Sequence, residues 1–144
     1  MIELIDTVDY HDFSLRGYTV RDYGRSILLD LVSHSDPSRE TALEFTDVIY
    51  YRFIHPGPAI ITYIHDLPFM DAVRELGIHI PEDFRQHGGL PKDFQSNEDY
   101  GVYFEAEGFR TWLISSAIGF VGMVVGRRLF HANHEFELIP GTRE

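Results

Sequence analysis

The 144-residue sequence contains no cysteine. Disulfide bridges, thiolate nucleophiles and zinc–thiolate centres are therefore excluded. The absence is compatible with a reducing compartment, and we expect a cytoplasmic protein. The N-terminus lacks a basic segment followed by a long apolar run, so the sequence predicts no signal peptide.

Lysine is nearly absent as well, because Lys92 is the single lysine and the other basic residues are arginines. With 23 acidic side chains against 12 basic ones, the formal net charge is −11. Duplex nucleic acid is a poor partner for such a surface, since phosphates need clustered basic side chains. A basic protein would be attracted to it, although high net charge also simply keeps a protein in solution.

No apolar run is long enough to span a bilayer as a helix, which takes about 20 residues. The apolar stretch at 112–126, WLISSAIGFVGMVVG, contains three glycines and two serines that weaken a helix. Its composition favours two buried strands joined by a turn over a membrane-facing segment. We therefore expect a soluble protein with no membrane partner.

Alternation of apolar and polar residues with period two dominates the chain and indicates strands. The alternation changes parity at Gly17, which predicts a β-bulge there, and residues 23–26 suit a hairpin turn. The predicted strands cover residues 13–23, 27–32, 43–45, 48–54, 60–65, 102–107, 109–116, 118–125 and 134–139.

The apolar period changes to that of a helix between Asp66 and Gly77. The residues that form the apolar stripe are Phe69, Ala72, Val73 and Leu76. We expect one short helix over about 68–76, with Asp66 as its N-cap and Gly77 just beyond its end. Residues 78–100 hold two prolines and two glycines and predict an irregular insertion. The whole of 1–144 thus predicts one α+β domain, built as a mainly antiparallel β-sheet or sandwich with one covering helix.

Motifs for covalent and phosphate chemistry are missing. There is no Gly-x-Ser-x-Gly elbow and no phosphate-binding glycine loop with a lysine. The carboxylate pairs Glu105/Glu107 and Glu135/Glu137 are spaced for one face of a strand, which is typical of the solvated face of an antiparallel sheet. The sequence therefore favours a non-enzymatic protein without a cofactor.

Two histidines form the best candidate metal pair. His131 and His134 are three residues apart, with acidic residues nearby. A metal centre also needs a third ligand, which the sequence does not identify. We therefore interpret both histidines as turn residues and expect no metal.

Three segments resemble a broad group of small bacterial β-rich domains. They are YHDF at 10–13, LEFTDV at 43–48 ahead of a Tyr-Arg-Phe strand, and WLISS at 112–116. Some members of that group are immunity proteins of toxin systems. The resemblance implies a domain that binds and occludes a toxin without catalysis, and it carries over no functional residues.

Three functional hypotheses remain open on the sequence. The leading one is an interaction or inhibitor domain that binds a basic protein through acidic side chains, namely Asp22, Asp30 and Asp36. The second is a small-molecule binder or enzyme with a pocket near residues 78–100 that uses Tyr51, His65 or Tyr103. The third is a structural subunit that self-associates into a homo-oligomer through the apolar strands at 112–125.

Overall fold

The computed structural model describes residues 2–4, 8–54, 59–87, 94–118, 120–131 and 142–143. Strands predominate in this part of the chain, and its strand pairings are antiparallel. The predicted α+β class with a mainly antiparallel sheet is thereby confirmed. The strands are β1 (Ile2–Leu4), β2 (Val8–Arg21), β3 (Ser26–Ser33), β4 (Glu40–Thr46), β5 (Tyr50–Ile54), β6 (Ala59–Asp66), β7 (Arg110–Ile118), β8 (Val121–Gly126), β9 (Arg128–His131) and β10 (Thr142–Arg143). The helices are the 3₁₀ turn η1 (Asp22–Gly24), α1 (Phe69–Leu76), α2 (Ile80–His87) and α3 (Asn97–Ala106).

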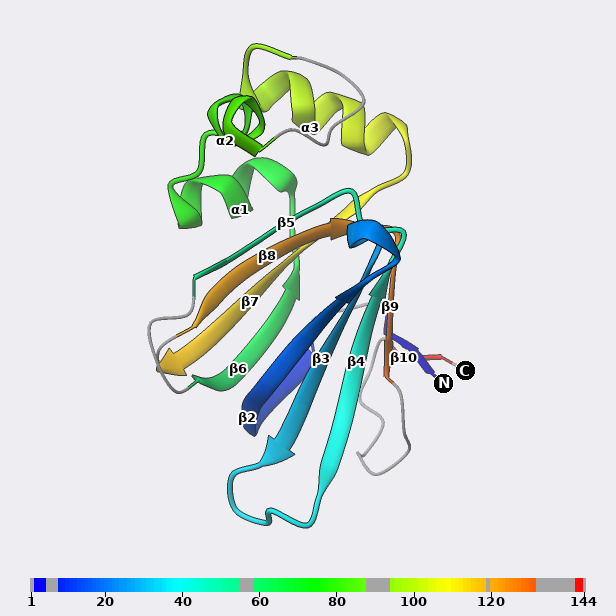
Figure 1. Ribbon diagram of the computed structural model, residues 1–144, viewed down its shortest axis with the longest axis vertical. Coiled ribbons are helices and arrows are strands. Elements are labelled where there is room, and N and C mark those ends of the chain that lie inside the picture. The colour runs from blue at the N-terminus through cyan, green and yellow to red at the C-terminus, as the bar shows by residue number, and fades with distance from the viewer. Residues whose placement is uncertain are drawn as a thin grey trace.

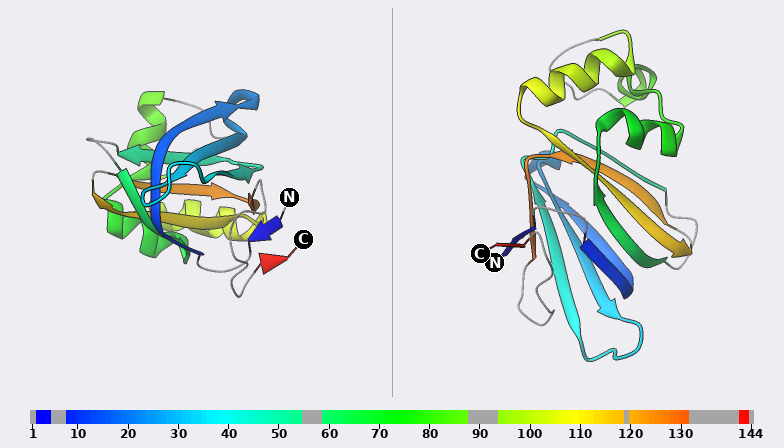
Figure 2. Two further views of the ribbon diagram at one scale, coloured as in Figure 1. Left: turned by 90° about the horizontal axis from the view of Figure 1, so that it is seen from below. Right: turned by 180° about the vertical axis from the view of Figure 1, so that it is seen from behind.

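The sheet folds over on itself. Its hydrogen-bonded order among the described residues is β10-β1-β9-β4-β3-β2-β6-β7-β8-β5. The half made of β2, β3 and β4 faces the half made of β6, β7 and β8 (Figure 1, Figure 2). Phe45 of β4 meets Trp112 of β7 with ring centroids 5.4 Å apart, so these two side chains bridge the halves. A hydrophobic core with members from both halves fills the space between them.

Two bends lie against each other at one end of the folded sheet, where β4 leads into β5 and β8 leads into β9. The Arg127 N–H donates to the Thr46 carbonyl at 3.1 Å, and the Ile49 N–H donates to the Val125 carbonyl at 2.8 Å. A Cβ on Gly126 would lie only 3.0 Å from the Thr46 carbonyl oxygen. The two backbones therefore approach this closely because position 126 is a glycine.

The period-two pattern of β3 corresponds to a strict alternation of half-buried and buried side chains. The inward side chains, all without exposed surface, are Ile27, Leu29 and Leu31. The register of β2 against β3 shifts between Leu15 and Gly17, which confirms the predicted bulge. The turn predicted over 23–26 is confirmed too, since η1 and Arg25 connect β2 to β3.

The apolar stretch 112–126 forms two paired strands, β7 and β8, as predicted. Five consecutive residues of β8 are buried, because both faces of this strand are covered. Val124 belongs to the core between the sheet halves, while Met123 and Val125 belong to a second cluster under the helices. In the described residues, none of the helices has the length and apolar character needed to cross a bilayer.

The helical layer is larger than the single helix expected. The predicted helix is confirmed as α1, and Gly77, with φ of 64°, ends it. The segment 78–100, expected to be irregular, instead contains α2 and the start of α3. Asn97 connects the two, because it accepts from the Ile80 N–H at 2.8 Å and donates to the Ile78 carbonyl at 2.9 Å. These bonds join residues distant in sequence, so no local pattern reveals them.

The strand predicted over 102–107 is wrong, because these residues lie in α3 and the turn that follows it. Ser96 begins the helix by accepting the Asp99 N–H at 3.1 Å. Tyr100 and Phe104, four residues apart, are buried in the second cluster. Helical burial of these two aromatic rings thus outweighs the strand preference of the segment.

Two further expectations are affected. Asp66 does not cap α1, because it ends β6 and accepts hydrogen bonds from the Arg110 guanidinium, while Pro68 holds the N-cap position. Glu105 and Glu107 do not share a strand face, since they lie in and just after α3. The strand predicted over 134–139 and the pair Glu135/Glu137 lie outside the described residues.

The contact between the two sheet halves can be tested at Phe45. Because this ring is completely buried, Phe45→Ala leaves a cavity in the core. We expect the free energy of unfolding to fall by about 3–5 kcal/mol, measured by urea denaturation. Val102→Ala, at an exposed position of α3, serves as control and should change it by less than about 0.5 kcal/mol. Similar losses for both variants would contradict this core.

Candidate functional site

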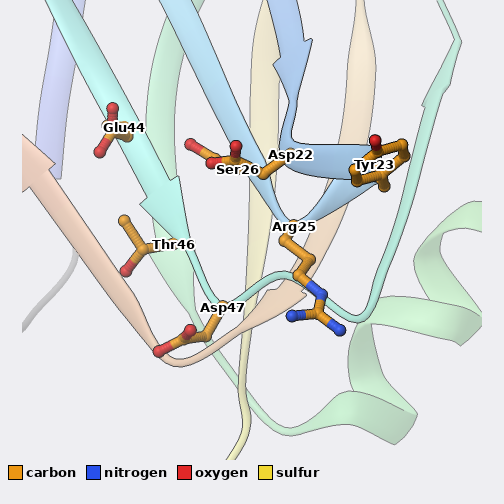
Figure 3. A pocket seen from close by; sticks show the side chains of 7 residues that line it. All are labelled: Asp22, Tyr23, Arg25, Ser26, Glu44, Thr46 and Asp47. Atoms are coloured by element: carbon orange, nitrogen blue, oxygen red, sulfur yellow. The ribbon is translucent and has the colours of Figure 1, made fainter.

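A cavity of about 650 Å³ lies on the outer face of β3 and β4, beside the η1 turn. Its lining is entirely polar or aromatic and consists of Asp22, Tyr23, Arg25, Ser26, Glu44, Thr46 and Asp47. Figure 3 shows the Tyr23 ring projecting from η1 away from the side chains of Glu44, Thr46 and Asp47. We refer to Asp22, Tyr23, Glu44 and Asp47 as the acidic corner.

The pairing register of β3 and β4 determines which of their polar side chains line the cavity. Ile27 lies opposite Phe45, and both side chains point into the core. Successive side chains of a strand point to opposite faces, so Ser26, Glu44 and Thr46 point outward. The same alternation that builds the core therefore supplies the polar wall of the cavity.

Three of the remaining lining residues have a left-handed backbone conformation that non-glycine residues rarely adopt. The non-glycine residues with positive φ in the described chain are Asp22 at 53°, Tyr23 at 58° and Asp47 at 51°. All three line this cavity. A left-handed backbone is tolerated by aspartate but is unusual for a bulky ring, and such strain clusters at functional sites.

Two backbone hydrogen bonds hold the strained turns in place. The Arg25 N–H donates to the Asp22 carbonyl at 3.1 Å and closes η1. The Val48 N–H donates to the Arg25 carbonyl at 2.8 Å and fastens the β4–β5 bend to that turn. The Tyr23 ring is nevertheless fully exposed. The chain thus presents an aromatic side chain to solvent from a fixed backbone.

The charge of the cavity is negative. Three carboxylates and one guanidinium, that of Arg25, line it. The pKa of the Arg128 guanidinium is raised mainly by the hydrogen bonds and charge of Glu3. The charge of Asp47 makes a smaller contribution, so Asp47 lies near Arg128. In the described chain, no three His, Asp or Glu side chains are placed to hold a metal ion. The arrangement suits a cationic side chain of a partner.

The cavity contains hydroxyl groups but no histidine. The hydroxyl groups of Ser26 and Thr46 are the lining groups closest in type to a nucleophile, and no histidine stands among the residues that line the cavity. Activation of a serine or threonine needs an adjacent base.

Only one of the three carboxylates predicted to bind a basic partner lies in this cavity, and that is Asp22. Asp30 is engaged within the chain by Arg16, whose Nε and Nη2 donate to it at 3.0 and 2.9 Å. Arg16 also donates to Glu40 at 2.7 Å, and this bond lowers the pKa of Glu40. Asp36 accepts from the hydroxyl and N–H of Ser38 in its own loop, which lowers its pKa.

The residues predicted for a small-molecule pocket do not come together. Tyr51 of β5 and His65 of β6 lie in strands separated by β7 and β8. Tyr51 contacts Phe53, which packs on the core between the sheet halves, whereas Tyr103 packs in the cluster under the helices. Phe94 and Tyr103 are in ring contact, so the described end of segment 78–100 is packed on α3.

The candidate metal pair is divided between described and undescribed chain. His131 is buried in β9 and its Nε2 lies 2.9 Å from the Thr41 hydroxyl. His134 lies outside the described residues. The described member of the pair is thus engaged with a neighbouring strand.

Sequence reasoning missed Tyr23, Arg25, Glu44 and Asp47. Residues 23–26 were identifiable as a turn, and Glu44 as an outward position beside Phe45. What brings them together is the pairing of β3 with β4 and the bond from Val48 to Arg25. The sequence signal that could have identified this site is Tyr23, an aromatic residue in the predicted turn directly after Asp22.

A second polar cluster joins β5 to α2. The Tyr50 hydroxyl donates to Asp83 at 2.7 Å, and the Arg52 guanidinium donates to the other oxygen of Asp83 at 2.6 Å. Burial, followed by the bond to Asp83, raises the pKa of Tyr50. These contacts fasten a helix to the sheet.

Comparisons with known proteins find no matching family model, no matching curated protein and no matching solved structure. The functional argument therefore depends on the residues of the site.

The pKa of Tyr50 predicts alkaline destabilisation. Above pH 10 the unfolded chain loses the phenol proton, whose ordinary pKa is about 10, while the folded chain keeps it. The contribution of Tyr50 to the free energy of unfolding is complete below pH 10. Above pH 10 the free energy of unfolding falls by about 1.4 kcal/mol per pH unit. Tyr50→Phe should lower stability at pH 7 and flatten its fall between pH 10 and 11, measured by urea unfolding. An unchanged slope would contradict a neutral, buried Tyr50.

Proposed function

We propose that this chain is a non-catalytic protein-binding domain that holds a basic partner at the acidic corner. The observation that carries the proposal is Tyr23, a fully exposed aromatic residue in left-handed backbone that lines the same cavity as Asp22, Glu44 and Asp47. A strained, exposed aromatic side chain contributes nothing to packing, so a contact with another molecule accounts for it best.

The chemistry of the corner fits a basic partner in two ways. Tyrosine is enriched among the residues that dominate binding energy, and its ring also attracts cations over its face. The adjacent carboxylates, within a chain of net charge −11, would accelerate encounter with a positively charged protein. A toxin bound by an immunity protein, as the sequence resemblance suggests, is one such partner.

The other two hypotheses gain no support from the described residues. The parts of 78–100 that the structure describes form helices packed on the sheet. Among the described residues of the apolar segment 112–125, Trp112, Ile114, Phe120 and Val124 pack in the core between the sheet halves, while Met123 and Val125 pack under the helices. A self-association through those strands would first have to displace the helices.

The role of Tyr23 can be tested by measuring how one variant changes both the stability of the chain and its affinity for a partner. Tyr23→Gly places a glycine where left-handed backbone is required and removes no packing, so it should raise stability by about 0.5–1 kcal/mol. The same variant should lose about 30-fold or more in affinity for a partner recovered by affinity capture from a lysate of the source organism. Thermal denaturation and titration calorimetry provide the two readouts. Lower stability together with unchanged affinity would contradict the proposal.

Charge reversal tests the electrostatic part. Asp22→Lys should weaken binding of that partner about tenfold at low salt, and the difference should shrink as salt rises. Glu75→Lys, at an exposed position of α1, changes the net charge equally and serves as the matched control. Equal losses for both variants would mean that overall charge, and not the acidic corner, governs binding.

A further inference from the structure

The strand β5 forms one end of the sheet and pairs, within the described residues, with β8 alone. Figure 1 shows it at the rim of the sheet beside β8. An edge strand presents unpaired N–H and C=O groups that another chain can pair with, and proteins usually blunt such edges with charges or proline. The one charged residue of β5, Arg52, is held by Asp83 of α2.

Exposed apolar side chains gather around this edge. Among the described residues, five of the seven exposed large hydrophobic residues lie on β5, on the end of β2 or on η1, namely Tyr18, Val20, Tyr23, Tyr51 and Ile54. Tyr18 of β2 meets Phe53 of β5 with ring centroids 4.9 Å apart, and Tyr51 meets Phe53 at 5.4 Å. The two strands therefore share one aromatic surface, which we name the β5 platform and define as Tyr18, Tyr51 and Phe53.

The β5 platform is held in position by its contacts with Gly122 of β8 and with the buried Phe120. Phe53 lies directly opposite Gly122 of β8, and a Cβ on Gly122 would come within 2.6 Å of the Phe53 ring. Glycine at this position leaves the room that the ring occupies. Phe53 also contacts the buried Phe120 at 5.3 Å, which anchors the ring to the core. A surface held this way loses little conformational entropy when a ligand binds.

The β5 platform and the acidic corner are continuous along the chain. β2 runs from Tyr18 into Asp22 and Tyr23, and Asp47 precedes β5 by a few residues. The bond from the Val48 N–H to the Arg25 carbonyl holds these two chain segments together. An extended segment lying along β5 would thus approach η1, which carries Asp22 and Tyr23, with the end that lies beside Tyr50.

We infer that β5 accepts an extended segment of a partner protein as an added strand, with apolar side chains on the β5 platform and Lys or Arg residues at the acidic corner. This inference rests on the proposed function and specifies the form of the partner. Charge complementarity selects the occupant, because the chain has a net charge of −11 and because Asp22 and the exposed Tyr23 lie on η1, which is bonded to the bend that leads into β5. Main-chain bonds to an edge strand supply affinity, and alternate side chains supply specificity. A second copy of this strongly acidic chain would bring like charges together at the same corner.

The test uses a phage-displayed library of random 12-residue peptides, selected on the full chain at low salt. We expect the selected peptides to combine alternating aromatic or β-branched residues with Lys or Arg at one end. One synthetic peptide from the selection is then titrated by fluorescence polarisation against the variants. Tyr51→Lys should weaken its binding about 30-fold or more, since lysine blocks an edge and removes part of the β5 platform.

Two controls separate strand addition from ordinary hydrophobic contact. Tyr63→Lys changes a tyrosine with nearly the same exposure, 39% against 36% for Tyr51, in the interior strand β6 and should alter affinity less than threefold. A peptide with the same side chains but N-methyl groups at alternate residues should bind at least tenfold more weakly. Hydrogen–deuterium exchange by NMR should show slower exchange of the outward-facing amides of residues 50–54 when the unmodified peptide is bound.

Each remaining outcome overturns the inference in an identifiable way. Selected peptides that lose affinity with Asp22→Lys but neither respond to Tyr51→Lys nor slow exchange in β5 would refute strand addition and leave the proposed function standing. A selection without binders, or without enrichment of Lys and Arg, would count against both. A dimer of the unmodified chain that Tyr51→Lys converts to a monomer in analytical ultracentrifugation would assign the edge to a second copy.

Discussion

The contact between the backbones at Gly126 and Thr46 is the constraint on which the site depends. It lets the β8–β9 bend lie against the β4–β5 bend. The β4–β5 bend carries Asp47, and through Val48 it is bonded to the η1 turn that presents Tyr23. A side chain at position 126 would press on the Thr46 carbonyl and on Val48, so glycine at this position favours the close approach of the two bends.

Ion pairs within the chain divide the many acidic residues into two groups. Arg16 holds Asp30 and Glu40, and Arg110 and Arg52 each hold one further aspartate, at the end of β6 and in α2. These partly exposed pairs individually contribute little stability, but they direct the carboxylates toward arginine side chains of the same chain. In the described chain, Asp22, Glu44 and Asp47 have no ion pair of this kind, as is also true of exposed acidic residues of α1 and α3 such as Glu75 and Glu98. What distinguishes the corner is that its three carboxylates line one cavity.

The helical layer has a role in this arrangement that the strands alone do not fulfil. It covers the outer face of β8 and fastens to β5 through the contacts of Asp83 with Tyr50 and Arg52. That leaves β5 supported on its helix-facing side while its aromatic residues Tyr51 and Phe53 face the other way. The edge strand is therefore stable enough to persist and exposed enough to bind, which is the combination that strand addition requires.

Much of the fold follows from local pattern in the sequence. Period-two alternation determined the position of β3 and the pair β7 and β8, and the parity change at Gly17 determined the bulge, because burial of one strand face leaves a signature within a few residues. The helix α3 was not visible in this way, since its aromatic residues suit a strand equally well and only their burial against the sheet decides between the two. Asp22 could be singled out as an acidic residue, but Asp30 and Asp36 could not be distinguished from it without knowing their partners. Tertiary structure alone joined Tyr23, Glu44 and Asp47, because residues about twenty positions apart become neighbours only through strand register and long-range backbone hydrogen bonds.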